Sequence, residues 1–189
     1  MLAYLKGISP DPERQEEIQT TYLESCAGYA VATYLLAIGD RHLENLMVTE
    51  NGNMFHLDFG FILGRNPPKK SAWVPPIRIN KPMVLGMGGL GSKGYEIFKD
   101  KTIDAFLYLR NSRNYILNIL VMMVDASIND LPRETYQEIL SKMNDRFLPG
   151  CSNEEARARF ANIIDESVNA FFAEHIMETM HRVAVWFKY

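Results

Sequence analysis

Two short stretches of the chain, Gly39–Asn45 (GDRHLEN) and His56–Gly60 (HLDFG), decide how the rest is interpreted. Phosphoryl transfer requires a group that orients or deprotonates the attacking hydroxyl, and oxygen ligands that hold magnesium on the nucleotide phosphates. The first stretch places Asp-Arg-His two residues before Asn45, and the second contains Asp58-Phe-Gly. Asn45 and Asp58 supply the oxygen donors that magnesium prefers. The two stretches together therefore predict a phosphoryl-transfer site.

The residues between the two stretches predict how they meet. Leu46–Thr49 and Met54–Leu57 have the pattern of two short strands, and the Asn-Gly pair at Asn51 is a strong hairpin signal. A hairpin folds the end of its second strand back beside the start of its first. We therefore expect Asn45 and Asp58 to lie together as ligands of one metal ion.

Four further residues are candidates for catalytic roles. His42 accepts a proton near neutral pH, which makes it a natural general base, but Asp40 can also serve as the base or can hold His42 or Arg41 in place. Arg41 is expected to brace the catalytic loop. His56 is close enough in sequence to orient Asp58 or a phosphate, although a core histidine on a strand is an equally good interpretation.

The order of these motifs resembles one family. Ordinary protein kinases carry His-Arg-Asp-x-x-x-x-Asn, whereas the inverted Asp-Arg-His with two residues before its Asn resembles the phosphatidylinositol 3/4-kinase family and the related giant protein kinases. Other stretches resemble the class III phosphatidylinositol 3-kinases in particular, and the match runs from Thr21 to the last residue. These stretches are Ser25–Tyr29, Phe55–Arg65, Met83–Gly89 and Ile164–Val168.

The resemblance implies a fold and an activity. The expected fold is mainly α with a small β-hairpin, the C-terminal lobe of a protein-kinase-like fold, covering residues 1–189. It comprises the catalytic loop (39–45), the Asp-Phe-Gly and activation segment (58–89) and a helical remainder (92–189). The expected reaction is ATP-dependent phosphorylation of the inositol 3-hydroxyl of phosphatidylinositol with Mg²⁺ or Mn²⁺, in endosomal trafficking and autophagy. Because no strand-rich region precedes residue 39, we expect the N-terminal lobe to be absent from this chain.

Apolar residues at three- and four-residue spacing predict long helices. Ile116–Val124 is apolar almost all round, so we expect it to be central, with Met122 and Met123 as core filler. The glycines of Gly86–Gly91 fit a nucleotide-binding pattern letter for letter, but no βαβ frame surrounds them, which favours a tight turn with positive φ. The predicted helices are Glu13–Ile38, Tyr95–Asn111, Arg113–Ser127, Arg133–Phe147 and Asn153–Phe187.

Charge is unevenly distributed along the chain. The stretch 59–95, called here the basic segment, holds six Lys and Arg residues and no acidic residue, so the remainder carries −9 against −3 for the whole chain. A basic loop beside a metal site suits an anionic lipid head group, and the resemblance implies the same. Lys69, Lys70 and Arg65 are the candidate substrate contacts, unless the lysines form a merely solvated loop. Trp73 is a candidate for the membrane interface, or packs under the loop.

Composition sets the remaining limits. With 189 residues the chain is long enough for one domain with a core, and its apolar fraction of 47% indicates a globular protein. Cys26 and Cys151 lack metal or disulfide spacing, and Cys26 is expected to be a buried, reduced thiol. The run Ala27–Ile38 is too short to cross a bilayer, so we expect a soluble protein.

Partners and location follow from the resemblance and the composition. We expect a cytoplasmic protein, peripheral on endosomal or autophagic membranes, with a protein-kinase-like regulatory subunit, an autophagy scaffold and no nucleic acid as partners. Trp186 and Phe187 at the end of the last helix are candidates for membrane contact. Two alternatives stay open: a phosphatidylinositol 4-kinase or giant protein kinase, and a catalytically incompetent lobe that binds membranes or partners.

Overall fold

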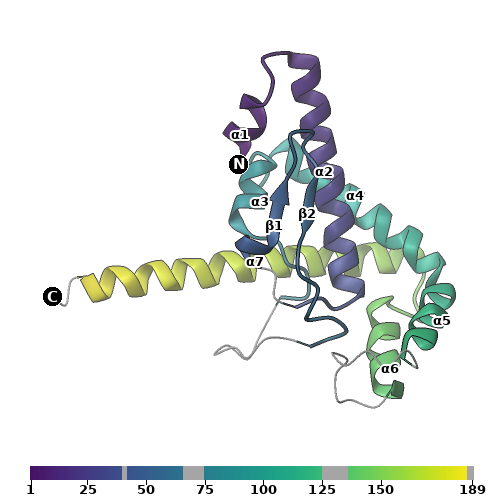
Figure 1. Cartoon of the computed structure of the whole chain (residues 1–189). Coiled ribbons are helices and arrows are strands. Elements are labelled where there is room, and N and C mark those ends of the chain that lie inside the picture. The colour runs from purple at the N-terminus through teal and green to yellow at the C-terminus, as the bar shows by residue number, and fades with distance from the viewer. Residues whose placement is uncertain (40–41, 66–74, 125–135, 187–189) are drawn as a thin grey trace.

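The computed structural model describes residues 1–39, 42–65, 75–124 and 136–186, and from residue 171 onward it describes the helical backbone without the side chains. These residues form helices and one two-stranded antiparallel sheet (Figure 1). The predicted fold class, mainly α with a small hairpin, is confirmed. Within the described ranges, no helix is long and apolar enough to cross a bilayer.

Helix α2 (Pro12–Leu35) is the element on which the others pack. A side-chain oxygen of Asp11 accepts a hydrogen bond from the Glu13 backbone N–H at 3.2 Å, and Pro12 supplies the preset φ of a first helical residue. The helix ends at Leu35, before the predicted Ile38, and Ala37 then adopts a left-handed backbone with φ of 46°. Its buried residues include Ile18, Tyr22, Cys26, Ala27, Ala30, Val31 and Tyr34.

Cys26 lies within this buried face as a free thiol. Burial raises the pKa of the thiol from 9.0 to about 12, because the charged thiolate is poorly solvated inside the core. The predicted burial of this cysteine is confirmed.

Helices α4 (Lys93–Asn111) and α7 (Asn153–Trp186) close the core against α2. Phe106 of α4 stacks on Phe160 of α7 with ring centroids 3.9 Å apart, and Tyr34 of α2 meets Phe160 edge-on at 5.1 Å. All three rings are buried, so they join the three helices through both apolar area and ring geometry. Beyond this contact α7 runs past the other elements toward the C-terminus (Figure 1).

The start of α7 has a capping box formed by Ser152 and Glu155. The Glu155 N–H donates to the Ser152 hydroxyl oxygen at 3.2 Å, and the Ser152 N–H donates to the Glu155 carboxylate at 2.8 Å. The expected boundaries of α4 and α7 are also met to within two residues, except that Phe187 lies outside the described residues.

Helices α5 (Arg113–Val124) and α6 (Tyr136–Arg146) correct one prediction. α5 is not central: Ile119, Met122 and Met123 are 37%, 68% and 41% exposed, so the expectation that the two methionines fill the core is wrong. Leu120 of α5 is buried, in a second small cluster. That cluster and the edge of the main core, which Ile116 and Leu117 meet, cover one side of α5, while Ile119, Met122 and Met123 stay exposed. The other buried members of the small cluster are Leu63, Ile139 and Met143.

Two short helices were not predicted. α1 (Leu2–Gly7) precedes α2, and α3 (Lys81–Gly86) ends at Gly86, the first residue of the stretch expected to be a turn. α3 forms because the Asn80 side chain accepts from the Met83 N–H at 3.0 Å and Pro82 suits the first turn. The turn begins after this helix, where Gly88, Gly89 and Gly91 have φ of 105°, 97° and 72°. The expectation of a glycine turn with positive φ is confirmed there.

Candidate active site

The predicted hairpin is present and sets the geometry of the site. Strands β1 (Leu46–Val48) and β2 (Met54–His56) pair antiparallel, with Leu46 opposite His56. One residue beyond this pair, the Leu57 N–H donates to the Asn45 carbonyl at 2.8 Å. Asn45, at the end of the short helix η1 (Leu43–Asn45), therefore lies across from Leu57, the residue that precedes Asp58. The pairing confirms that the ends of the two motifs come together.

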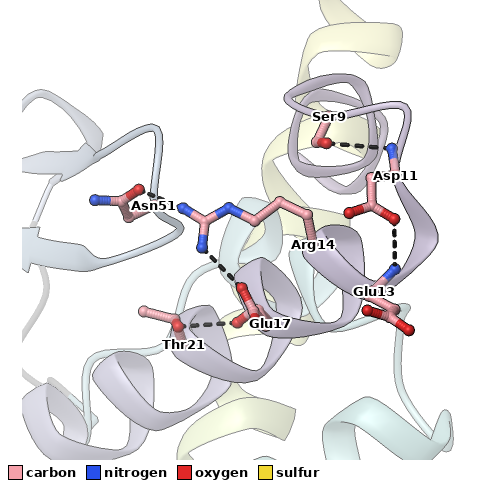
Figure 2. Close-up of polar contacts among 7 residues, drawn as sticks. All are labelled: Ser9, Asp11, Glu13, Arg14, Glu17, Thr21 and Asn51. Atoms are coloured by element: carbon pink, nitrogen blue, oxygen red, sulfur yellow. Dashed lines mark hydrogen bonds and ion pairs between the residues drawn. The ribbon is translucent and has the colours of Figure 1, made fainter.

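The tip of the hairpin is held by the N-terminal half of α2. The guanidinium of Arg14 donates to the side-chain oxygen of Asn51 at 2.6 Å and to the carboxylate of Glu17 at 2.8 Å (Figure 2). Gly52 lies so close to α2 that an added Cβ would be 2.3 Å from the Ile18 carbonyl oxygen. Its φ of 87° also favours glycine. The helix thus fixes the tip by a side-chain contact and by close backbone approach.

The second strand is held by the C-terminal half of α2. The Ser25 hydroxyl accepts from the Met54 N–H at 2.9 Å, and the ring of Tyr29 stacks on His56 with centroids 4.9 Å apart. These α2 residues follow one another at helical spacing on one face: Arg14, Ile18, Ser25 and Tyr29. The position of Asn45 relative to Asp58 is therefore tied to a rigid helix.

Backbone hydrogen bonds join the two motifs on their other side as well. The Gly39 N–H donates to the Phe61 carbonyl at 2.8 Å, and the Leu63 N–H donates to the Leu36 carbonyl at 2.9 Å. A third bond links the Gly64 N–H to the Ala37 carbonyl at 3.0 Å. The chain entering the first motif and the chain leaving the second are thus bonded to each other.

Asp58 has a backbone conformation often found at functional positions. Its φ is 56°, and its carboxylate accepts a hydrogen bond from the Gly60 N–H at 3.0 Å. Asp tolerates the left-handed region better than most residues, and the short bond to Gly60 supports it. The residue is exposed, whereas Asn45 is 8% exposed. The carboxylate is therefore accessible to a ligand beside a nearly buried amide.

The oxygen donors present fit a magnesium site of the kind that shares its ion with a nucleotide. Within the described residues, no group of three or more His, Cys, Asp and Glu side chains converges on one point. Magnesium at phosphoryl-transfer sites takes one or two protein oxygens and completes its octahedron with phosphates and water. Asn45 and Asp58 match this pattern.

Large exposed apolar side chains lie close in sequence to the two candidate ligands. Leu43, Met47, Leu57 and Phe59 are 55%, 49%, 41% and 47% exposed, and each lies within two residues of Asn45 or Asp58 in sequence. Four apolar side chains exposed beside a polar pair are typical of a surface that binds a ligand or another part of a protein.

Sequence comparison identifies the family to which this arrangement belongs. The family model described as phosphatidylinositol 3- and 4-kinase matches residues 1–133. The chain belongs to this family. It is 40% identical over its whole length to the phosphatidylinositol 3-kinase of Schizosaccharomyces pombe and covers 24% of that protein. It is also 40% identical to the enzyme of Arabidopsis thaliana and 35% identical to that of Saccharomyces cerevisiae, covering 23% and 21% of them. The chain spans about a quarter of the length of these curated relatives.

The two candidate catalytic histidines of this kinase-family chain differ in their exposure. His42 is exposed at the start of η1, with its Nδ1 4.0 Å from a carboxylate oxygen of Glu44. His56 is 4% exposed and faces α2 through its stack on Tyr29. Asp40 and Arg41 lie outside the described residues, and the four catalytic roles stay predictions.

Among the candidate lipid contacts, the structure describes the surroundings of Arg65. Arg65 is half-buried, and its guanidinium carbon lies 5.4 Å from the centre of the Phe61 ring. The first residues of the basic segment, up to Arg65, therefore lie close to the two motifs. Lys69, Lys70, Trp73, Phe187 and the side chain of Trp186 lie outside the described part of the chain.

Sequence reasoning missed the residues that hold the hairpin. Ser25 and Tyr29 belong to a stretch noted for family resemblance, but neither carries a signal that it contacts a strand. Arg14 and Asn51 are ordinary surface residues in the sequence, and their contact joins positions 37 residues apart. Such pairs become visible only once helix and hairpin are docked.

Proposed function

We propose that this chain forms the catalytic lobe of a phosphatidylinositol 3-kinase, which transfers the γ-phosphoryl group of ATP to the inositol 3-hydroxyl of phosphatidylinositol. The observation that carries the proposal is the hairpin register, which sets Asn45 beside the Asp-Phe-Gly segment while α2 holds the hairpin. The names of the relatives support the substrate and the position of the transferred group.

The proposed chemistry needs few groups. The 3-hydroxyl oxygen attacks the γ-phosphorus, its proton passes to His42 or Asp40, and the bond to the bridging oxygen of the β-phosphate breaks to release ADP. Asn45 and Asp58 hold Mg²⁺ or Mn²⁺, whose charge offsets that of the β- and γ-phosphates. The exposed position of His42 suits a base that meets a substrate hydroxyl arriving from solvent.

The basic segment supplies the proposed lipid specificity. Lys69, Lys70 and Arg65 contact the head-group phosphate in this proposal, and each basic side chain near an anionic membrane contributes about 1 kcal/mol. In the same proposal Trp73, Phe187 and Trp186, the last residue of α7, contact the bilayer interface. The protein then acts as a peripheral enzyme on endosomal or autophagic membranes, with a protein-kinase-like regulatory subunit and an autophagy scaffold as partners.

The test uses the protein at the full length that its gene encodes. Vesicles containing phosphatidylinositol are incubated with ATP and Mg²⁺, and the deacylated products are separated to distinguish 3-phosphate from 4-phosphate. We expect 3-phosphate from the wild type and a loss on the order of 100-fold or more for Asp58→Asn. Asn keeps the left-handed backbone and an acceptor for the Gly60 N–H, so Asp58→Asn is expected to fold. Asp100→Asn, an exposed change on α4, is the matched control.

The remaining outcomes separate the alternatives. A 4-phosphate product would assign the protein to the phosphatidylinositol 4-kinases. Full vesicle binding without any lipid product, in wild type and variant alike, would support a lobe that binds membranes without catalysis.

A further inference from the structure

A buried serine of α7 holds the end of the basic segment. The Ser167 hydroxyl oxygen accepts a hydrogen bond from the Ile77 N–H at 3.3 Å, across 90 residues of sequence. The same hydroxyl donates to the Ile163 carbonyl, one helical turn earlier, at 2.6 Å. Ser167 and Ile77 are both fully buried, so water does not compete for this contact. The hydroxyl therefore bonds to its own helix and to the chain that returns from the basic segment.

The helix around Ser167 is itself fixed. Lys99 of α4 donates to both carboxylate oxygens of Asp165, at 2.7 and 2.8 Å. Ile164 and Val168, which flank Ser167 on the buried side of α7, belong to the main core. Ser167 is thus a rigid support, because α7 is locked to α4 one half-turn before it.

Residues 75–80, called here the return stretch, contact Ser167 at Ile77 and then lead into α3. Ile77 and Ile79 are buried in the main core, and Arg78 between them is half-buried. The stretch ends at Asn80, which caps α3. Its entry into the core is therefore set at Ile77 by a hydrogen bond and at Asn80 by a helix cap.

Helix α3 is held from the other side by α2. The Tyr22 hydroxyl donates to the Met83 carbonyl at 3.2 Å, and the Gln19 side-chain amide donates to the Gly86 carbonyl at 2.9 Å. The basic segment is thus attached to the core at both ends, because residues 61–64 near its start are hydrogen-bonded to residues 36–39, as described above.

We propose that Ser167 is a positioning residue for the lipid substrate: its buried hydroxyl fixes the return stretch on α7 and so sets where Arg78 and this end of the basic segment lie. This inference rests on the proposed function. Ser167 acts through the return stretch and does not itself touch lipid. In this proposal α7 helps to position the lipid-binding residues, in addition to packing in the core.

The expected effect of Ser167→Ala follows from the loss of one buried acceptor. A hydrogen bond between neutral groups contributes about 1 kcal/mol, which corresponds to about a fivefold change at 1.4 kcal/mol per factor of ten. We expect kcat/KM for phosphatidylinositol to fall about fivefold, while KM for ATP stays within about twofold. Ser167→Thr keeps a hydroxyl that can bond in the same two directions and should restore the lipid kinetics.

Thr102→Val is the matched control. Thr102 is also fully buried in a helix and donates to a carbonyl one turn earlier, that of Phe98, at 2.7 Å. This bond stays within α4. Removal of this hydroxyl tests the general cost of losing a buried helical hydroxyl, without touching the return stretch.

Two measurements on the full-length protein decide the matter. Steady-state kinetics with phosphatidylinositol vesicles measure the lipid and ATP constants, and amide hydrogen exchange measures protection of residues 75–80. Support requires faster exchange in the return stretch together with the selective loss of lipid kcat/KM, in Ser167→Ala but not in Thr102→Val. Faster exchange with unchanged lipid kinetics would overturn the positioning role, and unchanged exchange would overturn the contact itself.

The design separates the two hypotheses. If the wild type makes no phosphoinositide, the proposed function fails and the positioning role falls with it, while exchange still tests the Ser167 contact. If Ser167→Ala does not fold, Ser167→Cys, which keeps a similar volume with a weaker acceptor, is expected to give the same selective loss.

Discussion

The docking of the hairpin on α2 predicts a large effect for a small change, Gly52→Ala. The added methyl group would lie 2.3 Å from the Ile18 carbonyl oxygen, which is shorter than any allowed van der Waals distance between the two atoms. The φ of 87° is itself strained for alanine. The backbone strain costs about 1–2 kcal/mol. Relief of the overlap requires the tip to move away from α2, which weakens the exposed Arg14–Asn51 contact and costs about 1 kcal/mol more.

Gly64→Ala is the control because it isolates the first of these costs. Gly64 also has φ of 87°, but an added Cβ there meets no atom of the described residues within 4 Å. Urea unfolding of the purified protein should therefore show Gly52→Ala to be less stable than Gly64→Ala by at least about 1 kcal/mol. Equal losses of unfolding free energy in the two variants would refute the idea that close approach to α2 fixes the hairpin tip.

Two further predictions concern the core. Arg110 donates to the Asn153 side chain and to three carbonyls, those of Phe147, Leu148 and Cys151. Arg110→Lys should therefore lower the unfolding free energy by about 1.5–3 kcal/mol. Denaturant titration should show a loss of about 0.5 kcal/mol or less for the control, the exposed Arg157→Lys. Burial raises the pKa of Cys26 to about 12, so the unfolded chain releases this proton first as pH rises. Stability should fall between about pH 9 and pH 12, less steeply in Cys26→Ala, and a parallel fall in both proteins would contradict this.

The sequence predicts the local part of this structure well because its determinants are local. An Asn-Gly pair between two short apolar runs specifies a hairpin, and the serine and glutamate at Ser152 and Glu155 specify a helix start. The adjacency of Asn45 and Asp58 then follows from strand pairing alone. Nothing distant in the chain is needed for these features.

The depth of a helix in the fold is not local information. α5 is as apolar as a central helix, yet Met122 is 68% exposed, because the described residues that pack on α5 meet its other side, around Ile116, Leu117 and Leu120. The composition of a helix shows how much apolar surface it has to bury, whereas its exposure depends on which other elements pack against it. The contacts of Arg14, Ser25 and Ser167 were missed for the same reason, since each joins residues far apart in sequence.

The central claim is that Asn45 and Asp58 act on one metal ion. A double-mutant cycle with Asn45→Ala, Asp58→Asn and the combined variant, read as kcat for phosphatidylinositol phosphorylation, tests it most directly. Residues that act as a unit are strongly non-additive, so we predict that the combined variant is no slower than the slower single variant. If the two losses instead multiply, the residues act independently and the shared site is contradicted.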